Sequence, residues 1–355
     1  MSLHTVPPGS PGHLMAAEML EQPTVLRRLL DGSAAIRAVA EQVSARGPRF
    51  VLLTARGTSD NAALYAKYLV ETQLGRPCGL TSMSTTTVYD AAQVLSDCLV
   101  ICVSQSGGSP DLVASARAAR GAGAVTLAVT NNAASPLAAA CEFHLDVLAG
   151  EERALPATKT YTAELLALYL FVAYWRGGDG AEEAGLLPEL AERVLAERDS
   201  VAALAARYRF AQRVLLTSRG FGYPTAREAA LKLMETSYLP ALAYSGADLL
   251  HGPLAMVDHL FPVLAVVPDG PGGAALEPVL DRLGAREADV AVVGPGDQVA
   301  RASGGGCALP TAGVPEELQP LLQILPLQLL AWEVTRARGQ DPDAPRGLAK
   351  VTETR

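Results

Sequence analysis

A loop rich in hydroxyl and glycine residues, SQSGGSPD, occupies positions 104–111. Three serines and two glycines ahead of a helical stretch can offer hydroxyls and free backbone N–H groups to one anion. The alternative is an ordinary capped turn, because Ser109 can cap the helix and Pro110 suits its first position; for SGGSP alone both explanations remain open. A second hydroxyl-rich loop, RGTSDN at 56–61, is expected at the same end of the sheet and favours a phosphate site.

A second candidate for chemistry is the stretch REAALKLMETSY at 227–238. Lys232 and Glu235 are three residues apart and therefore share one helix face. Neighbouring apolar side chains would partly remove Glu235 from water, an environment that suits a general base. The alternative is a solvated helix with a Glu228–Lys232 pair at i,i+4, and spacing alone favours that alternative.

Two further side chains stand where a turn or a tail could direct them into a site. YSGADLLHGPL (244–254) places His251 after a short capped turn and before Gly252-Pro253. The helix dipole there favours a charged imidazole, although a histidine bonded to nearby backbone is at least as common. The tail DPDAPRGLAKVTETR has little apolar mass, so Lys350 is either a frayed surface lysine or part of a segment that folds over a site.

Short apolar runs of strand length alternate with helical stretches along the whole chain. This alternation predicts βαβ units and parallel sheets covered on both faces. Ligands of such sheets bind beyond the carboxyl ends of the strands, where the polar loops lie. The predicted strands are 50–54, 99–104, 124–130 and 143–147 in the first half, and VLLTS from Val214, 263–267 and 290–294 in the second.

The motif VLLT-x-RG occurs twice, from Val51 and from Val214, and indicates a duplicated domain. Gly57 and Gly220 would permit the same tight strand-to-helix turn. Only the first copy is followed by a serine cluster, so one phosphate site per chain is expected. The predicted organisation is an N-terminal arm and helix (1–45), a first domain with the phosphate loops (46–178), a linker helix (179–209), a second domain with the Lys232/Glu235 helix and the histidine loop (210–340), and a C-terminal tail over the site (341–355).

The length and composition of the chain restrict the classes of protein to which it can belong. The length of 355 residues suits about two domains, and a net charge of −8 argues against a protein that coats nucleic acid. The five cysteines contain no C-x-x-C pair and are expected to be small buried hydrophobes; the five histidines form no ligand pattern, so neither a metal nor a cofactor is expected. No signal peptide is evident, and the longest apolar run, LLALYLFVAYW, is too short to cross a bilayer. We therefore expect a cytoplasmic protein without a membrane partner.

Taken together, these motifs resemble the sugar isomerase (SIS) domain family, above all the isomerase half of glucosamine-6-phosphate synthase and the SIS-type aminosugar-phosphate deaminases. The resemblance runs over nearly the whole chain, through HLMAAEMLEQP, RGTSDN, SQSGGSPD, ATKTYT, EAALKLMETSY, LLHGPLAMVD and DPDAPRGLAK. It implies an α/β fold of two tandem SIS domains, each a doubly wound parallel sheet flanked by helices. It also implies a homodimer whose active sites use both subunits and bind a small phosphosugar.

The resemblance also assigns roles to residues of this sequence. Glu235 would move the proton at sugar C2, His251 would assist ring opening and cross over between subunits, and Lys350 would contact the open-chain sugar. Lys232 shares the helix of Glu235 and completes the catalytic set. The phosphate-binding residues would be Thr58, Ser59, Ser104, Gln105, Ser106 and Ser109.

Departures from the family pattern bear on the reaction. The chain shows no N-terminal glutaminase domain and no N-terminal catalytic cysteine, so glutamine-driven amination is not expected. The synthase has ELKHG where this chain has DLLHG, KLKE where it has KLME, and a glutamate where it has Leu242. A pocket that loses charge suits an uncharged substituent, such as an acylated nitrogen, better than a free ammonium group.

The leading hypothesis is an enzyme that opens the ring of a hexosamine 6-phosphate and removes the C2 proton, of the deaminase or isomerase type. The alternatives are a dehydratase (lyase) of an N-acylated hexosamine 6-phosphate, such as N-acetylglucosamine 6-phosphate, and fructosamine-phosphate deglycation. A non-catalytic sugar-phosphate sensor is the alternative outside enzymes. Retention of Glu235, His251 and Lys350 argues against a sensor, which needs no base.

Overall fold

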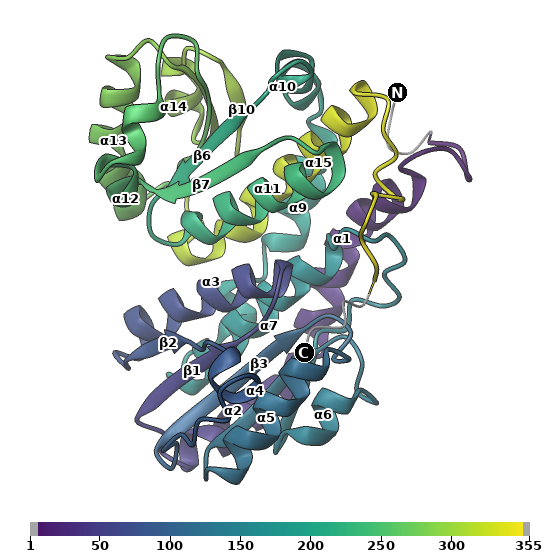
Figure 1. Ribbon diagram of the computed structural model, residues 1–355, viewed down its shortest axis with the longest axis vertical. Helices are drawn as coiled ribbons and strands as arrows, with labels where there is room; N and C mark the ends of the chain where they lie inside the picture. The colour runs from purple at the N-terminus through teal and green to yellow at the C-terminus, as the bar shows by residue number, and fades with distance from the viewer. Residues whose placement is uncertain (1–5, 351–355) are drawn as a thin grey trace. The chain divides into compact units, whose positions relative to one another are not determined.

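The computed structural model describes residues 6–350 and divides into two compact units, each with its own parallel sheet (Figure 1). The first-sheet unit comprises Thr24–Glu152, Lys159–Leu186 and residues 348–350. The second-sheet unit comprises residues 6–23, Arg153–Thr158 and Leu187–Gly347. The predicted tail residues beyond 350 lie outside the described residues.

The first sheet has five parallel strands in the order β2-β1-β3-β4-β5. β3 and β4 are buried along their whole length, as expected of central parallel strands covered on both faces. The chain reverses its direction of travel across the sheet between β1 and β3, which makes that position the switch point where ligands gather. The strands are β1 Phe50–Thr54, β2 Cys78–Leu80, β3 Cys98–Ser104, β4 Val125–Thr130 and β5 Phe143–Asp146.

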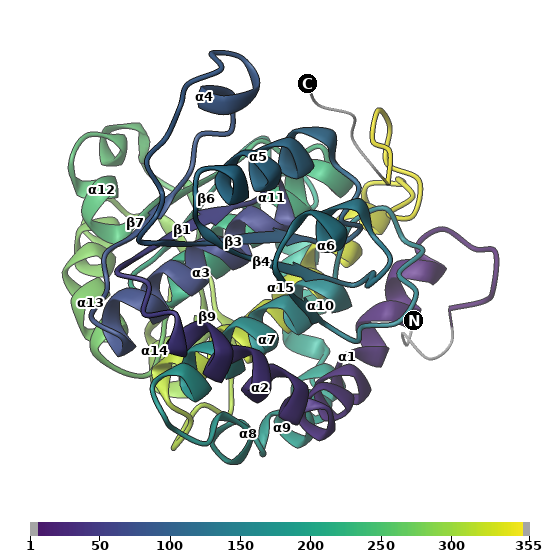
Figure 2. The same ribbon diagram turned by 90° about the horizontal axis from the view of Figure 1, so that it is seen from below.

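Helices cover both faces of this sheet. Figure 2 shows α5 and α6 on one side of β1, β3 and β4, and α2, α3 and α7 on the other. Every residue of α7 is buried, which agrees with the prediction that the apolar run from Leu165 forms a core helix. The helices are α2 Ser33–Ala45, α3 Thr58–Gln73, α4 Ser84–Thr87, α5 Pro110–Gly121, α6 Pro136–Ala140, α7 Lys159–Trp175 and α8 Gly180–Glu183; α1, His13–Asp31, contains residues of both units.

The second sheet repeats the topology of the first. Its order is β10-β9-β8-β6-β7, so in both sheets the strands follow the same chain order, second-first-third-fourth-fifth, and all pairs are parallel. Gly57 and Gly220 both have positive φ, 57° and 60°, as the repeated VLLT-x-RG motif predicts. The strands are β6 Val214–Ser218, β7 Ala241–Ser245, β8 Pro262–Val266, β9 Asp289–Gly294 and β10 Gly306–Ala308. The predicted two-domain α/β fold is confirmed.

The helices of the second-sheet unit centre on α11 and α15, which pack against each other. Their buried contact includes a 2.8 Å hydrogen bond between the hydroxyls of Thr236 and Thr335. The stretch 179–209, predicted as one linker helix, contains α8 and two further helices. The elements are α9 Leu187–Ala196, α10 Asp199–Tyr208, α11 Gly222–Ser237, α12 Gly246–Leu250, α13 Pro271–Gly284, α14 Gly296–Arg301, α15 Pro320–Ala337, and the 3-10 helices η2 Pro253–Met256 and η3 Glu316–Leu318.

The segment after α15 is fixed to the second-sheet unit by side chains and backbone. Asp343 accepts hydrogen bonds from the backbone N–H groups of Leu14 and Met15, at 2.8 and 2.9 Å, and so caps the first turn of α1. Further on, the Arg346 N–H donates to the Tyr238 hydroxyl at 2.8 Å, and the guanidinium lies 4.0 Å from the centre of the Tyr238 ring. The tail is therefore ordered by specific contacts up to this point.

Candidate active site

The two hydroxyl-rich loops follow β1 and β3, the strands on either side of the switch point in the first sheet. Thr58 is the first residue of α3 and is half-buried, and Ser109 directly precedes α5. Both loops therefore stand at carboxyl strand ends and at helix N-termini, where backbone N–H groups and the helix dipole favour an anion.

The loop 104–109 is held in a tight conformation by its own hydroxyls. Ser104 Oγ accepts the Gly107 N–H at 3.1 Å, and Ser106 Oγ accepts the Gly108 N–H at 3.2 Å. Gly107 has a φ of 63°, and a Cβ at this position would lie 2.3 Å from Ser135 Oγ. Only glycine meets both requirements, which gives this residue of the motif a structural reason.

The hydroxyl of Ser109 does not have the capping role that the sequence allowed. Ser109 occupies the N-cap position with extended backbone, yet its side chain makes no capping hydrogen bond, whereas Ser135 caps α6 by accepting the Ala138 N–H. Pro110 does fill the first helical position, as predicted. The Ser109 hydroxyl is thus not engaged by the helix that it precedes.

Ser59 differs from its neighbour Thr58. Its hydroxyl donates to Glu164 Oε1 on α7 at 2.9 Å, and both residues are buried. That contact anchors the start of α3 to the core helix.

An ion pair that the sequence did not single out joins the two loops. Nε and Nη2 of Arg56 each lie 3.1 Å from Oδ2 of the buried Asp111.

In the second sheet, the side chain of Glu316 lies against the loops that follow β6 and β8. The Glu316 carboxylate accepts the Gly272 N–H at the start of α13, at 3.0 and 3.2 Å. A Cβ at Gly270 or Gly272 would lie 2.4 Å from a Glu316 oxygen, so glycines make the room for this carboxylate. The single phosphate site per chain, at the first sheet, stays a prediction.

Lys232 on α11 lies between two glutamates. Its Nζ is 2.5 Å from Glu235 Oε2 and 3.4 Å from Glu228 Oε1. The side chains of Lys232 and Glu228 are 1% and 0% exposed, whereas that of Glu235 is 21% exposed. The Glu228–Lys232 pair therefore exists, but it is buried and not on a solvated face as the alternative required. Glu235 is the member of the cluster that solvent, and hence a ligand, can reach.

His251 immediately follows α12 and is exposed. The predicted capped turn is confirmed, because Ser245 Oγ accepts the Asp248 N–H at 3.5 Å at the start of α12, and the His251 N–H donates to the Asp248 carbonyl at 3.1 Å at its end. His251 lies outside α11, the helix that carries Lys232 and Glu235. All three residues belong to the second-sheet unit, whereas the serine loops and Lys350 belong to the first-sheet unit.

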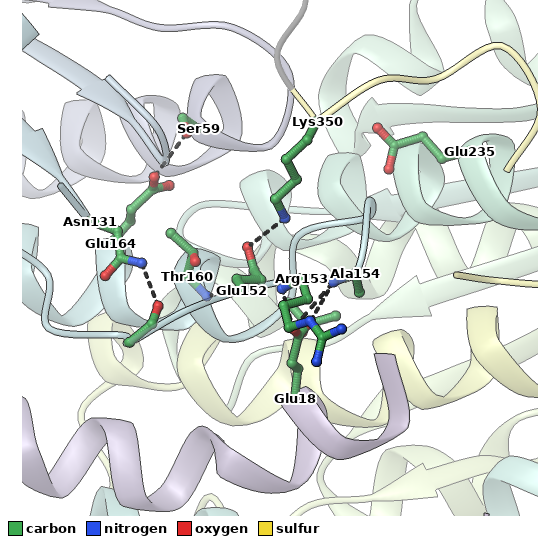
Figure 3. Close-up of polar contacts among 12 residues, drawn as sticks. Glu18, Ser59, Asn131, Glu152, Arg153, Ala154, Thr160, Glu164, Glu235 and Lys350 are labelled. Atoms are coloured by element: carbon green, nitrogen blue, oxygen red, sulfur yellow. Dashed lines mark hydrogen bonds and ion pairs between the residues drawn. The ribbon is translucent and has the colours of Figure 1, made fainter. Parts of the chain in front are cut away.

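Lys350 points toward a buried carboxylate of its own unit, Glu152 (Figure 3). The distance from Lys350 Nζ to Glu152 Oε2 is 3.6 Å, and Glu152 Oε1 accepts the Thr160 N–H in the first turn of α7 at 3.1 Å. In the second-sheet unit, Glu18 accepts the N–H groups of Arg153 and Ala154. Sequence analysis missed Glu152 and Glu18, because their partners are remote backbone groups and a tail lysine that no local pattern indicates.

Residues 6–350 contain no group of three or more His, Cys, Asp and Glu side chains that could hold a metal ion. The cysteines are free, and all except the half-buried Cys78 are buried, as predicted. Within the same described residues, no helix is long and apolar enough to cross a membrane.

Comparison with known proteins connects these features to one family. The sequence model of the SIS domain matches residues 43–174 and 208–336. The glutamine–fructose-6-phosphate aminotransferase (isomerizing) of Methanothermobacter thermautotrophicus is 34% identical over 343 residues, which covers 96% of this chain and 58% of the relative. The chain thus spans less than two thirds of the length of this relative.

Solved structures identify the part of such relatives that this chain matches. The C-terminal domain of glucosamine-fructose-6-phosphate aminotransferase from Francisella tularensis has a TM-score of 0.82 at 27% identity, over 94% of this chain and 98% of that one. A candidate phosphosugar isomerase from Silicibacter pomeroyi has a TM-score of 0.84 at 34% identity, over 93% and 99%. With two matched segments, two sheets of one topology and relatives along nearly its whole length, the chain belongs to the SIS domain family.

Proposed function

We propose that this chain is an enzyme that opens the ring of a hexosamine 6-phosphate and removes its C2 proton, in a reaction of the deaminase or isomerase type. Family membership supports a sugar-phosphate substrate, and the relatives described above are named for aminotransfer with isomerisation or as a phosphosugar isomerase. The observation that carries the proposal is the state of Glu235: a partly exposed carboxylate fixed by a buried lysine.

The chemistry follows from the acidity of the open-chain sugar. The aldehyde at C1 acidifies the C2–H bond, so a fixed carboxylate can accept that proton and leave an enediol or enolamine. If the proton returns to C1, a ketose or its imine forms; with an amine at C2, addition of water then releases ammonia. Lys232 holds the Glu235 carboxylate in one orientation, and its charge offsets the two neighbouring carboxylates.

The phosphate group would bind at the first sheet. Ser104, Ser106 and Ser109 and the side chain of Gln105 come from one loop, and Thr58 from the other, at the N-termini of α5 and α3. The Ser109 hydroxyl, which does not cap its helix, is the first donor we expect to meet the phosphate. Ser59 is assigned to the same site, although its proton points to Glu164, so we expect it to support Thr58 and contribute less.

The remaining roles depend on assembly. His251 is exposed on the second-sheet unit, as a residue that completes the site of a partner subunit would be. We propose a homodimer in which His251 assists ring opening across the interface, while Lys350 contacts the open-chain sugar. Replacement of His251 should then be complemented by mixing with a Glu235 variant, because a mixed dimer regains one intact site.

A second candidate, dehydration of an N-acylated hexosamine 6-phosphate, is favoured by three apolar positions of the second-sheet unit. Met234 and Leu242 are 41% and 50% exposed, and Leu250 is half-buried, where the synthase pattern has polar residues. Exposed apolar side chains would suit an acyl group better than an ammonium group. With the nitrogen acylated, the same C2 carbanion would expel the C3 hydroxyl, which would leave as water with the proton that Glu235 took from C2, and a double bond would form between C2 and C3.

Proton NMR in D2O distinguishes these reactions. The protein is incubated with glucosamine 6-phosphate and, separately, with its N-acetyl form, while C2–H exchange, ammonia, ketose and vinylic signals are followed. Glu235→Gln is expected to lower the exchange rate by about 10²–10⁴-fold, the usual contribution of a general base; Glu151→Gln, at an exposed position, is the control. Saturable binding without exchange of either sugar would refute the proposal and favour a sugar-phosphate sensor.

A further inference from the structure

Glu152 is a buried acid for which the proposed reaction has so far no use. Its side chain is 0% exposed. It immediately precedes the segment whose N–H groups are bound by Glu18 and lies shortly before the core helix α7. A charged carboxylate in such a place is costly unless each oxygen has a partner.

The two oxygens of Glu152 have partners of different kinds. Oε1 accepts the Thr160 N–H in the first turn of α7, where the helix dipole also favours a negative charge. Oε2 lies 3.6 Å from the ammonium group of Lys350 (Figure 3). Glu152 is held in place by its hydrogen bond to α7, a helix that is buried along its whole length. Lys350 belongs to the C-terminal tail, so the contact fixes the lysine and not the glutamate.

The other contacts that hold the tail are made by residues that precede Lys350 in the chain. Asp343 binds the N-terminus of α1, and Arg346 stacks on Tyr238 at the end of α11. Residues 348–350 belong to the first-sheet unit, and the Lys350 side chain is only 29% exposed. The pairing with Glu152 therefore decides where the ammonium group is held.

We propose that Glu152 is a positioning residue, which seats the Lys350 ammonium group so that it meets the open-chain sugar. This inference rests on the proposed function for the role of Lys350, but the contact itself does not. Glu152 keeps one oxygen on the protein backbone, and the other attracts the Lys350 ammonium group at 3.6 Å. The ammonium group carries three N–H donors and can direct one of them to the substrate. This contact would place the Lys350 ammonium group correctly in the reacting complex, where a small displacement of a catalytic group lowers the reaction rate strongly.

Glu152→Gln separates this role from a structural one. The glutamine retains an oxygen for the Thr160 N–H but turns an NH2 group, a donor, toward the Lys350 ammonium group. We expect kcat for C2–H exchange to fall by about 10–100-fold with little change in KM. Glu151→Gln, which changes the adjacent exposed glutamate, is the matched control and should leave both constants unchanged.

A double-mutant cycle tests whether the effect passes through Lys350. In a Lys350→Met background, Glu152→Gln should cause no additional loss, because the residue that it positions is absent. If Glu152→Gln lowers kcat equally in both backgrounds, or leaves kcat unchanged in the wild-type background, the inference is wrong.

A second measurement keeps the inference distinct from the proposed reaction. Hydrogen exchange of the peptide 341–350 is compared in the wild type, Glu152→Gln and Glu151→Gln. Faster exchange in Glu152→Gln alone is expected even if neither sugar proves to be a substrate. Unchanged exchange would overturn the claim that Glu152 holds the tail lysine, whereas absence of C2–H exchange in the wild type would refute the proposed function alone.

Discussion

Gly107 provides a graded test of how the phosphate loop is built. Gly107→Ala would place a Cβ 2.3 Å from Ser135 Oγ and 2.6 Å from Ser135 Cβ, at a residue with a φ of 63°. The left-handed backbone conformation costs an alanine about 1–2 kcal/mol, and overpacking of a buried position costs about 1–3 kcal/mol. The free energy of unfolding should therefore fall by about 2–5 kcal/mol.

Two other glycines separate these contributions. Gly75, directly after the C-cap of α3, has a φ of 59°, and a Cβ added there would have no atom within 4 Å, so Gly75→Ala should cost only the backbone strain of about 1–2 kcal/mol. Gly121, the last residue of α5, has neither positive φ nor a close neighbour, so Gly121→Ala should be neutral or stabilise by up to about 1 kcal/mol.

Urea unfolding of the three variants provides the free energies, and phosphate titration of the folded proteins reports on the loop. Gly107→Ala should be the least stable of the three and should bind inorganic phosphate more weakly than the wild type. If Gly107→Ala unfolds with the same free energy as Gly75→Ala, the contact with Ser135 is not restrictive, and our explanation of the motif is refuted.

Two predictions concern acids outside the proposed site. Burial raises the pKa of the Glu316 carboxyl group, although the hydrogen bond from the Gly272 N–H opposes the rise. The folded protein therefore keeps this proton up to a higher pH than the unfolded chain does. The free energy of unfolding falls as the pH rises from the ordinary pKa through the raised pKa. Glu316→Gln does not lose this stability with rising pH. In thermal melts, the Tm of the variant minus the Tm of the wild type should therefore increase from about pH 4, near the ordinary pKa of glutamate, to neutral pH. A Tm difference that does not change with pH would contradict this. Asp343→Ala removes the acceptor from two N–H groups of α1 and should lower the free energy of unfolding by about 1–2 kcal/mol; Asp297→Ala, on the short helix α14, is the control, and an equal effect of the two would refute the capping role.

The sequence predicted the strands that carry continuous apolar runs, and it missed β2, β7 and β10. β2 and β10 have three residues each, CGL and GCA, and all three strands lie at sheet edges, where pairing with one neighbour compensates for weak local preference. β7, ALAYS, follows α11 after a short turn. Its five residues show too little alternation of polar and apolar side chains to be distinguished from the end of that helix. Such strands form because the neighbouring strand is already in place.

The candidate site was predictable where spacing within one element determines it. The i,i+3 relation of Lys232 and Glu235 predicts their contact, but not that Lys232 is buried, since burial depends on how α11 packs against α15. The roles of Glu152 and Asp343 could not be predicted, because each binds backbone groups or side chains brought near only by the complete fold. Acids of this kind look like solvated surface residues in a sequence.

The central claim, that Glu235 is the base at C2, is tested most directly by the loss of the C2 proton signal in D2O. We predict exchange by the wild type with glucosamine 6-phosphate or its N-acetyl form, and about 10²–10⁴-fold slower exchange by Glu235→Gln, which retains the fold and phosphate binding. Exchange at the wild-type rate by folded Glu235→Gln would contradict the assignment of the base.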